Sequence, residues 1–168
     1  MPTIEEIRDA LQTANDNDSS GPYEAICPFF ADQVEAIHEP RIPFDGVWDG
    51  ATLAKWLVVE RQVMNQVMTN RRHQGTFTIQ NGNQIVMDGV LTGTMPDGTE
   101  TSRETRTVWT IENGQIVQQL DDGRGFDQME NPLATMLGGL DISFTKLAAE
   151  HGIELPAFYA EAVAAAGM

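Results

Sequence analysis

The spacing of apolar residues predicts helices in the first part of the chain. Ile4, Ile7 and Leu11 recur at helical spacing, and a polar run over residues 15–21 ends that segment. A longer apolar stripe begins after Thr52, a residue type that caps helices, and continues for about four turns. Its apolar members fall on one helical face: Leu53, Trp56, Leu57, Val63, Met64, Val67 and Met68. We therefore expect a short first helix, a further helical turn near residue 26 and a long central helix.

The pattern changes to a period of two after Arg72. Three dipeptides typical of hairpin turns then divide the chain: Asn81-Gly82, Asp97-Gly98 and Asn113-Gly114. A consecutive antiparallel meander is predicted from the alternating segments 73–80, 84–94, 101–111 and 115–121. A short strand is expected earlier, over residues 34–39, before a loop that contains Pro40 and Pro43.

Pro132 opens a third region with a helical pattern. Helices are predicted over residues 133–137, 143–151 and 156–166, the last with a proline in its first turn. Their apolar faces are too short to fold alone. We therefore divide the chain into an α+β domain over residues 1–131 and a helical extension over residues 132–168 that packs on it, near its open end or along its sheet.

Composition excludes several classes of partner. The 168 residues fit one domain, and 10 Lys plus Arg against 25 Asp plus Glu give a net charge of -15. Nucleic acid and anionic membrane surfaces are bound by clustered cations, so neither is an expected partner. Cys27 is the single cysteine, which excludes an intrachain disulfide. With no secretory pattern at the start and no apolar run of about 20 residues, a cytoplasmic protein is expected.

The predicted order of elements, helix, helix, short strand, long helix and four meander strands, resembles the cone-shaped α+β fold shared by nuclear transport factor two, ketosteroid isomerase, scytalone dehydratase and SnoaL-type polyketide cyclases. The matching motifs are Phe30-Ala31-Asp32 followed by VEAIHEP over 34–40, PFDGVWDG over 43–50 and IENGQI over 111–116. The resemblance covers residues 4–127. It implies a curved antiparallel sheet wrapped over the long helix, a cystatin-like roll with a pocket open at one end.

The resemblance also implies candidate residues for proton transfer. Glu39, before Pro40, lies where ketosteroid isomerase carries its carboxylate base, and an apolar cavity raises the pKa of a carboxyl toward neutrality. The alternative is a loop carboxylate paired with Arg41. His38 alternates with Glu39 along the strand, so only one of the two faces the cavity, and we expect Glu39.

Two further candidates come from other members of the group. His73 has the spacing of a histidine in scytalone dehydratase, and Asp121 has that of the last-strand aspartate in limonene epoxide hydrolase. A hydrogen-bonded structural histidine and a solvated acid are the alternatives. No relative's full set is present, because the isomerase's oxyanion donors fall at Ile7 and Thr107 and the dehydratase's second histidine falls at Thr94.

Glu60 interrupts the apolar stripe of the long helix, where a buried charge is costly unless it is paired or protonated. It is therefore either a pocket carboxyl or a residue paired with Arg61 or a strand arginine. The other candidates for the pocket lining, each of which also suits an ordinary core, are His38, Trp48, Trp56, Met64, Phe77, Met87 and Trp109. The spacing of His38, Glu39 and His73 matches no compact metal signature, so neither a metal nor another cofactor is expected.

These residues predict a cofactor-independent proton-transfer enzyme of the dehydratase, isomerase or cyclase type. Its substrate would be a small apolar hydroxy or keto compound, with Glu39 as base and His73 or Asp121 as acid. The alternative is a non-catalytic module of the same fold that binds a small ligand or dimerises. A homodimer through the outer face of the sheet is expected, unless the helical extension covers that face.

Overall fold

The computed structural model describes residues 1–18, 21–122 and 143–166. Helix α1 (Ile4–Asn17) starts at a capping box in which Thr3 and Glu6 bond each other's backbone amides, and it buries Ile7 and Leu11. Helix α2 (Tyr23–Ile26) and the 3-10 turn η1 (Cys27–Phe29) follow. They lead directly into the first strand of the sheet.

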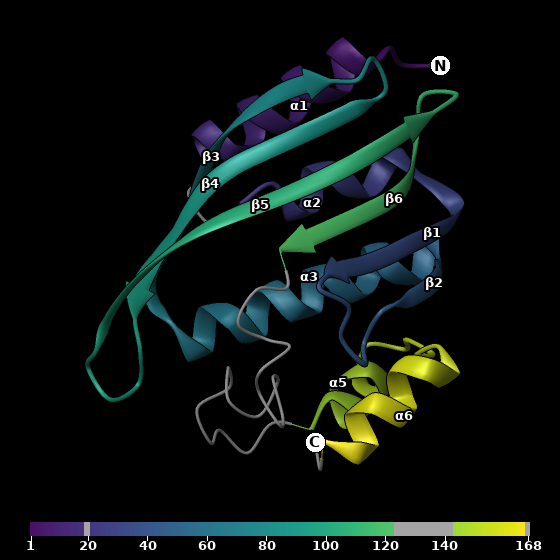
Figure 1. Cartoon of the computed structure of the whole chain (residues 1–168). Coiled ribbons are helices and arrows are strands. Elements are labelled where there is room, and N and C mark those ends of the chain that lie inside the picture. Colours follow the sequence, from purple (N-terminus) through teal and green to yellow (C-terminus); the bar gives the residue numbers. More distant parts are fainter. Residues whose placement is uncertain (19–20, 123–142, 167–168) are drawn as a thin grey trace.

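Six strands form one curved, unclosed sheet in the order β2-β1-β6-β5-β4-β3 (Figure 1). They are β1 (Phe30–Glu39), β2 (Gly46–Asp49), β3 (Thr69–Gln80), β4 (Gln84–Thr94), β5 (Glu100–Glu112) and β6 (Gln115–Asp122). The meander of β3 to β6 and the α+β class are confirmed. The sheet is mixed rather than wholly antiparallel, because β1 runs parallel to β6.

The hairpin turns follow the predicted dipeptides. Asn81 and Gly82, like Asn113 and Gly114, have positive φ angles at both positions, which suits the right-handed twist of the flanking strands. Strand β2, in contrast, lies in the segment predicted as a loop. Four residues are too few to show a periodicity, and this strand exists through its antiparallel pairing with β1.

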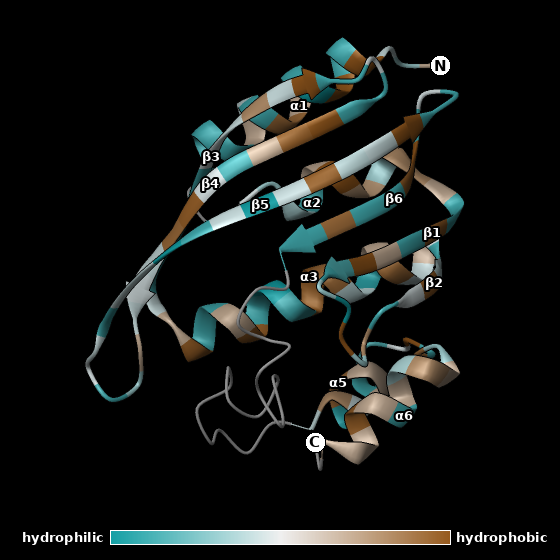
Figure 2. Ribbon diagram, viewed as in Figure 1, coloured by the Kyte–Doolittle hydropathy of each residue, from teal (hydrophilic) through white to brown (hydrophobic). Residues whose placement is uncertain are grey.

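The long helix α3 (Gly50–Val67) lies under the curve of the sheet (Figure 1). Its cap is Asp49 rather than the predicted Thr52, since the Asp49 carboxylate accepts hydrogen bonds from the Thr52 amide at 2.8 Å and hydroxyl at 2.9 Å. Gly50 allows the helix to begin against β1, because a Cβ there would stand 1.9 Å from the Ala31 carbonyl oxygen. Figure 2 shows apolar residues interspersed with polar ones along α3 and along β5 and β6.

Two helices from the C-terminal region pack beside α3 and β2: α5 (Phe144–Glu150) and α6 (Ala157–Ala165) (Figure 1). The Phe144 ring meets the Trp56 ring edge-on, with 5.3 Å between their centres, and the Phe158 and Trp48 rings do so with 5.8 Å between theirs. The predicted helix over 133–137 and the domain boundary at 131/132 lie outside the described residues. None of the described helices is long and apolar enough to cross a membrane.

Side chains of α1 form hydrogen bonds with the backbone of β3, which is an edge strand of the sheet. The Asn15 amide donates to the His73 carbonyl at 2.7 Å and accepts from the Gly75 amide at 2.9 Å. Gln12 accepts from the Phe77 amide at 3.0 Å. The exposed row of backbone groups that an edge strand presents is thereby partly covered by side-chain amides.

Candidate functional site

A cavity of about 280 Å³ lies between the concave face of the sheet and helices α2, α3 and α6. Most of its wall is apolar, and the larger apolar residues in it are Ile26, Ile37, Ile42, Phe44, Trp48, Leu53, Trp56, Leu57, Met64, Met87, Leu91 and Trp109. The predicted wall residues all appear except Phe77. That ring stacks on Trp109 at 5.9 Å and belongs to the core behind the wall.

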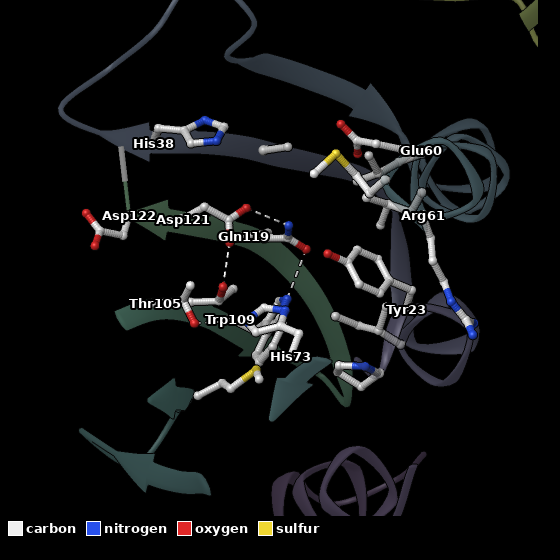
Figure 3. A pocket seen from close by; sticks show the side chains of 18 of the residues that line it. Tyr23, His38, Glu60, Arg61, His73, Thr105, Trp109, Gln119, Asp121 and Asp122 are labelled. Carbon is white, nitrogen blue, oxygen red and sulfur yellow. Dashed lines mark hydrogen bonds between the residues drawn. The ribbon is translucent and has the colours of Figure 1, made fainter. Parts of the chain in front are cut away.

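A chain of hydrogen bonds fixes Asp121 at the sheet side of this cavity (Figure 3). The Trp109 indole donates to Gln119 Oε1 at 3.0 Å, and Gln119 Nε2 donates to Asp121 Oδ2 at 2.7 Å. The Thr107 hydroxyl donates to Asp121 Oδ1 at 2.5 Å. The pairing of β5 with β6 sets these neighbours side by side, since Thr107 is opposite Asp121 and Trp109 is opposite Gln119. Both oxygens of Asp121 thus have a protein donor.

Glu60 brings a second carboxyl to the cavity from α3 (Figure 3). Burial raises its pKa from 4.5 to about 7, and the negative charge of Asp121 acts in the same direction. No hydrogen bond or ion pair joins Glu60 to another described residue. Arg61, its predicted alternative partner, pairs instead with Asp18 at 2.5 Å and Glu24 at 3.3 Å. Glu60 is therefore a cavity carboxyl that exchanges its proton near neutral pH.

His73 lies on β3 and also lines the cavity. Its Nε2 is 2.8 Å from the Thr105 hydroxyl, and its Nδ1 is buried without a hydrogen-bond partner among the described residues. Burial and the nearby Arg71 charge lower the pKa of His73 from 6.5 to about 4. The imidazole is consequently neutral at pH 7 and does not hold the extra proton that a general acid would deliver.

The structure reverses the predicted orientation of Glu39 and His38. His38 lines the cavity and its Nδ1 lies 2.7 Å from the buried Asp45 carboxylate, whereas Glu39 is exposed and absent from the lining. Successive strand residues point to opposite faces, and β1 turns its His38 face inward. The partner in the alternative interpretation of Glu39 is also engaged elsewhere, because Arg41 pairs with Glu35 at 3.1 Å.

The cavity residues that the sequence analysis missed include Tyr23, Arg71, Gln119 and Tyr159. The Arg71 guanidinium lies 5.5 Å from the Tyr23 ring centre and donates to the Tyr23 hydroxyl at 3.0 Å. Gln119 was detectable, since a strand places it on the same face as Asp121. The other three come from segments whose patterns give no sign of the cavity.

Comparison with known proteins identifies the fold. No protein-family model matches the chain, and no curated protein matches it in sequence. Among solved structures, an NTF2-like protein from Burkholderia thailandensis is 19% identical, with a TM-score of 0.53, over 72% of this chain and 90% of that one. A putative SnoaL-like polyketide cyclase from Mesorhizobium loti is 20% identical, with a TM-score of 0.50, over 71% and 98%.

A third similar structure is that of TerC, co-crystallised with polyporic acid, which is 21% identical with a TM-score of 0.50 over 74% of this chain and 95% of that one. Similar structures thus include polyketide cyclase-like proteins and proteins of unknown function. At this level of identity the likeness concerns the fold. The chain therefore has the NTF2-like fold, as the order of its sequence motifs predicted.

Proposed function

We propose that the protein is a cofactor-independent proton-transfer enzyme, a lyase or isomerase of the dehydratase, isomerase or cyclase type, for a small apolar hydroxy or keto compound. The supporting observation is Glu60, a carboxyl in a largely apolar cavity that has a pKa of about 7 and no hydrogen bond to another described residue. A group that gains and loses its proton near the working pH suits general acid-base catalysis.

In this proposal Glu60, rather than Glu39, removes a proton from the carbon beside a substrate carbonyl, and the C–H electron pair moves into an enolate. The neutral Glu60 that results no longer repels the fixed charge of Asp121. Glu60 then returns the proton to another carbon of the substrate, which isomerises it, or to a hydroxyl that leaves as water. Glu60 thus acts as base and acid in turn, and Asp121 tunes it.

The enolate oxygen needs a donor, and Tyr23 with Arg71 supplies one candidate. The Tyr23 hydroxyl points into the cavity on the side of Gln119 (Figure 3), and the Arg71 guanidinium stands behind it with a positive charge. Preorganised donors of this kind stabilise charge that develops during the reaction. His73 then contributes a neutral imidazole to the wall, and its role is contact with the substrate rather than proton delivery.

The test begins with a screen of flat apolar hydroxy and keto compounds for isomerisation, loss of water or exchange of carbon-bound hydrogen in D2O. Glu60→Gln keeps the shape and removes the proton acceptor, so kcat/KM should fall about 100-fold to 10,000-fold. The matched control is Glu112→Gln, which changes an exposed acid at the end of β5 and should retain the parent rate.

A change of kcat/KM centred near pH 7 should accompany turnover by the parent enzyme and disappear in Glu60→Gln. Glu60→Gln with the parent's rate and pH profile would overturn the assignment. Saturable binding without any hydrogen exchange, unchanged in Glu60→Gln, would instead establish a non-catalytic ligand-binding module.

The proposal includes a homodimer through the outer face of the sheet. Helices α1, α2 and α3 lie on the other side of the sheet, and α5 and α6 pack beside α3 and β2 (Figure 1). Val90 on β4 is 43% exposed, which is unusual for a large apolar strand residue. A second copy of the chain would cover it.

A further inference from the structure

The helix α6 inserts the Tyr159 ring into the wall of the cavity. The ring is 5% exposed and meets three aromatic residues of the cavity wall edge-on. Its centre lies 4.9 Å from that of Trp48, 5.5 Å from that of Phe44 and 5.6 Å from that of Trp56. One end of the cavity is therefore walled by a cluster of four aromatic rings, and the helical extension supplies one of them.

The hydroxyl of Tyr159 has a defined hydrogen-bond direction. The Trp56 indole nitrogen lies 3.2 Å from the Tyr159 oxygen, and since an indole N–H can only donate, the tyrosine oxygen is the acceptor. The phenolic proton has no acceptor among the described residues. Burial and the nearby Glu60 raise the pKa of Tyr159 well above its usual value, so the proton stays in place.

A buried donor that lacks an acceptor is costly, and a ligand that supplies the acceptor recovers that cost. On the cavity side, these lining rings offer a flat ring the edge-to-face or offset-stacked contacts that aromatic pairs prefer. A ligand that satisfies both features is planar and aromatic and carries a carbonyl or ether oxygen at this end.

We propose that Tyr159 determines specificity by donating its hydroxyl proton to an oxygen of a planar aromatic substrate. The inference rests on the proposed function in that it takes the cavity as the substrate site. It does not depend on turnover, because recognition by Tyr159 is a property of binding.

The helical extension thereby acquires a role in recognition. Phe158, next to Tyr159, packs against Trp48 and against Gly46, where a Cβ would stand 2.6 Å from the Phe158 ring. This close fit sets the position of α6 and with it the position of the Tyr159 hydroxyl. The site is incomplete without residues from α6.

The experiment compares 1-tetralone with tetralin, which has the same ring system and no oxygen, by isothermal titration calorimetry on the full chain. The parent should bind 1-tetralone about 10-fold more tightly, the scale of one buried hydrogen bond. Tyr159→Phe keeps the ring and should bind the two compounds equally. The control Thr110→Val removes a hydroxyl outside the cavity lining and should keep the parent's preference.

A second measurement observes Tyr159 in the parent chain, and the variant serves only to assign its resonance. The chain has two tyrosines, so 3-fluorotyrosine labelling gives two fluorine resonances, and the one absent from Tyr159→Phe belongs to Tyr159. We expect 1-tetralone to shift the Tyr159 resonance and tetralin to shift it less.

Three results would overturn the inference: equal binding of both compounds by the parent, a preference that survives in Tyr159→Phe, or no saturable binding of either compound. A Tyr159 resonance that responds equally to both compounds would also contradict it. Failure of the proposed function would give a different result. Glu60→Gln would then leave turnover unchanged, while the preference for 1-tetralone persisted.

Discussion

A carboxyl held in an apolar cavity wall, such as Glu60, lowers the stability of the fold at the pH at which it is charged. The unfolded chain releases this proton near pH 4.5 and the folded chain near pH 7, so stability is lost as pH rises through that window. This difference between the folded and unfolded pKa corresponds to up to about 3 kcal/mol in the free energy of unfolding. Glu60→Gln should therefore match the parent near pH 4 and exceed its free energy of unfolding at pH 8. Urea unfolding at both pH values measures this, and an identical pH dependence in parent and variant would contradict it.

The effect of His73 on stability depends on pH in the opposite direction. Its folded pKa of about 4 lies below its ordinary value of 6.5, so the unfolded chain binds the proton first as pH falls, and stability is lost from pH 6.5 down to 4. The loss is at most about 3 kcal/mol. His73→Gln should be less sensitive to acid in this interval, as measured by thermal unfolding at pH 7 and pH 4.5. A variant with the parent's full loss of melting temperature would place the acid-sensitive group elsewhere.

At the scale of elements, the side chains of α1 stabilise the edge strand β3. Asn15 is 1% exposed and serves two backbone groups of β3 at once, the His73 carbonyl and the Gly75 amide. Asn15→Leu leaves both groups buried and unpaired, which should cost about 2 to 4 kcal/mol in the free energy of unfolding. Asn17→Leu, at an exposed position of the same helix, should cost far less in urea titrations. Equal losses in the two variants would remove the edge-pairing role.

Local features of the fold could be predicted from the sequence, whereas features that depend on contacts between distant segments could not. Local signals sufficed for the hairpins, because the positive φ angles at Asn81 and Asn113 are encoded in the turn residues themselves. The orientation of His38 is set by the pairing of β1 with β6, more than 80 residues along the chain, and alternation alone leaves its phase open. Tyr159 is hydrogen-bonded to Trp56, which is 103 residues away in the sequence, and no sequence periodicity predicts that contact.

The whole molecule combines a strong net negative charge with an outer sheet face on which no described helix lies, and the two have opposite effects on association. Each chain carries a charge of -15, so two copies repel each other, while burial of the outer face around Val90 attracts them. Salt screens the repulsion, with a Debye length of about 10 Å at 0.1 M, and leaves the apolar attraction in place. Association should therefore tighten as ionic strength rises.

Light scattering at micromolar concentration should accordingly give twice the 18.5 kDa chain mass, with a dissociation constant that falls between low and moderate salt. Val90→Lys places a charge within the proposed interface and should yield monomers. Thr13→Lys is the control, because Thr13 is exposed on α1, which lies on the other side of the sheet (Figure 1). A monomeric parent at every salt concentration, or loss of the dimer in Thr13→Lys alone, would show that the outer face of β4 does not join two chains.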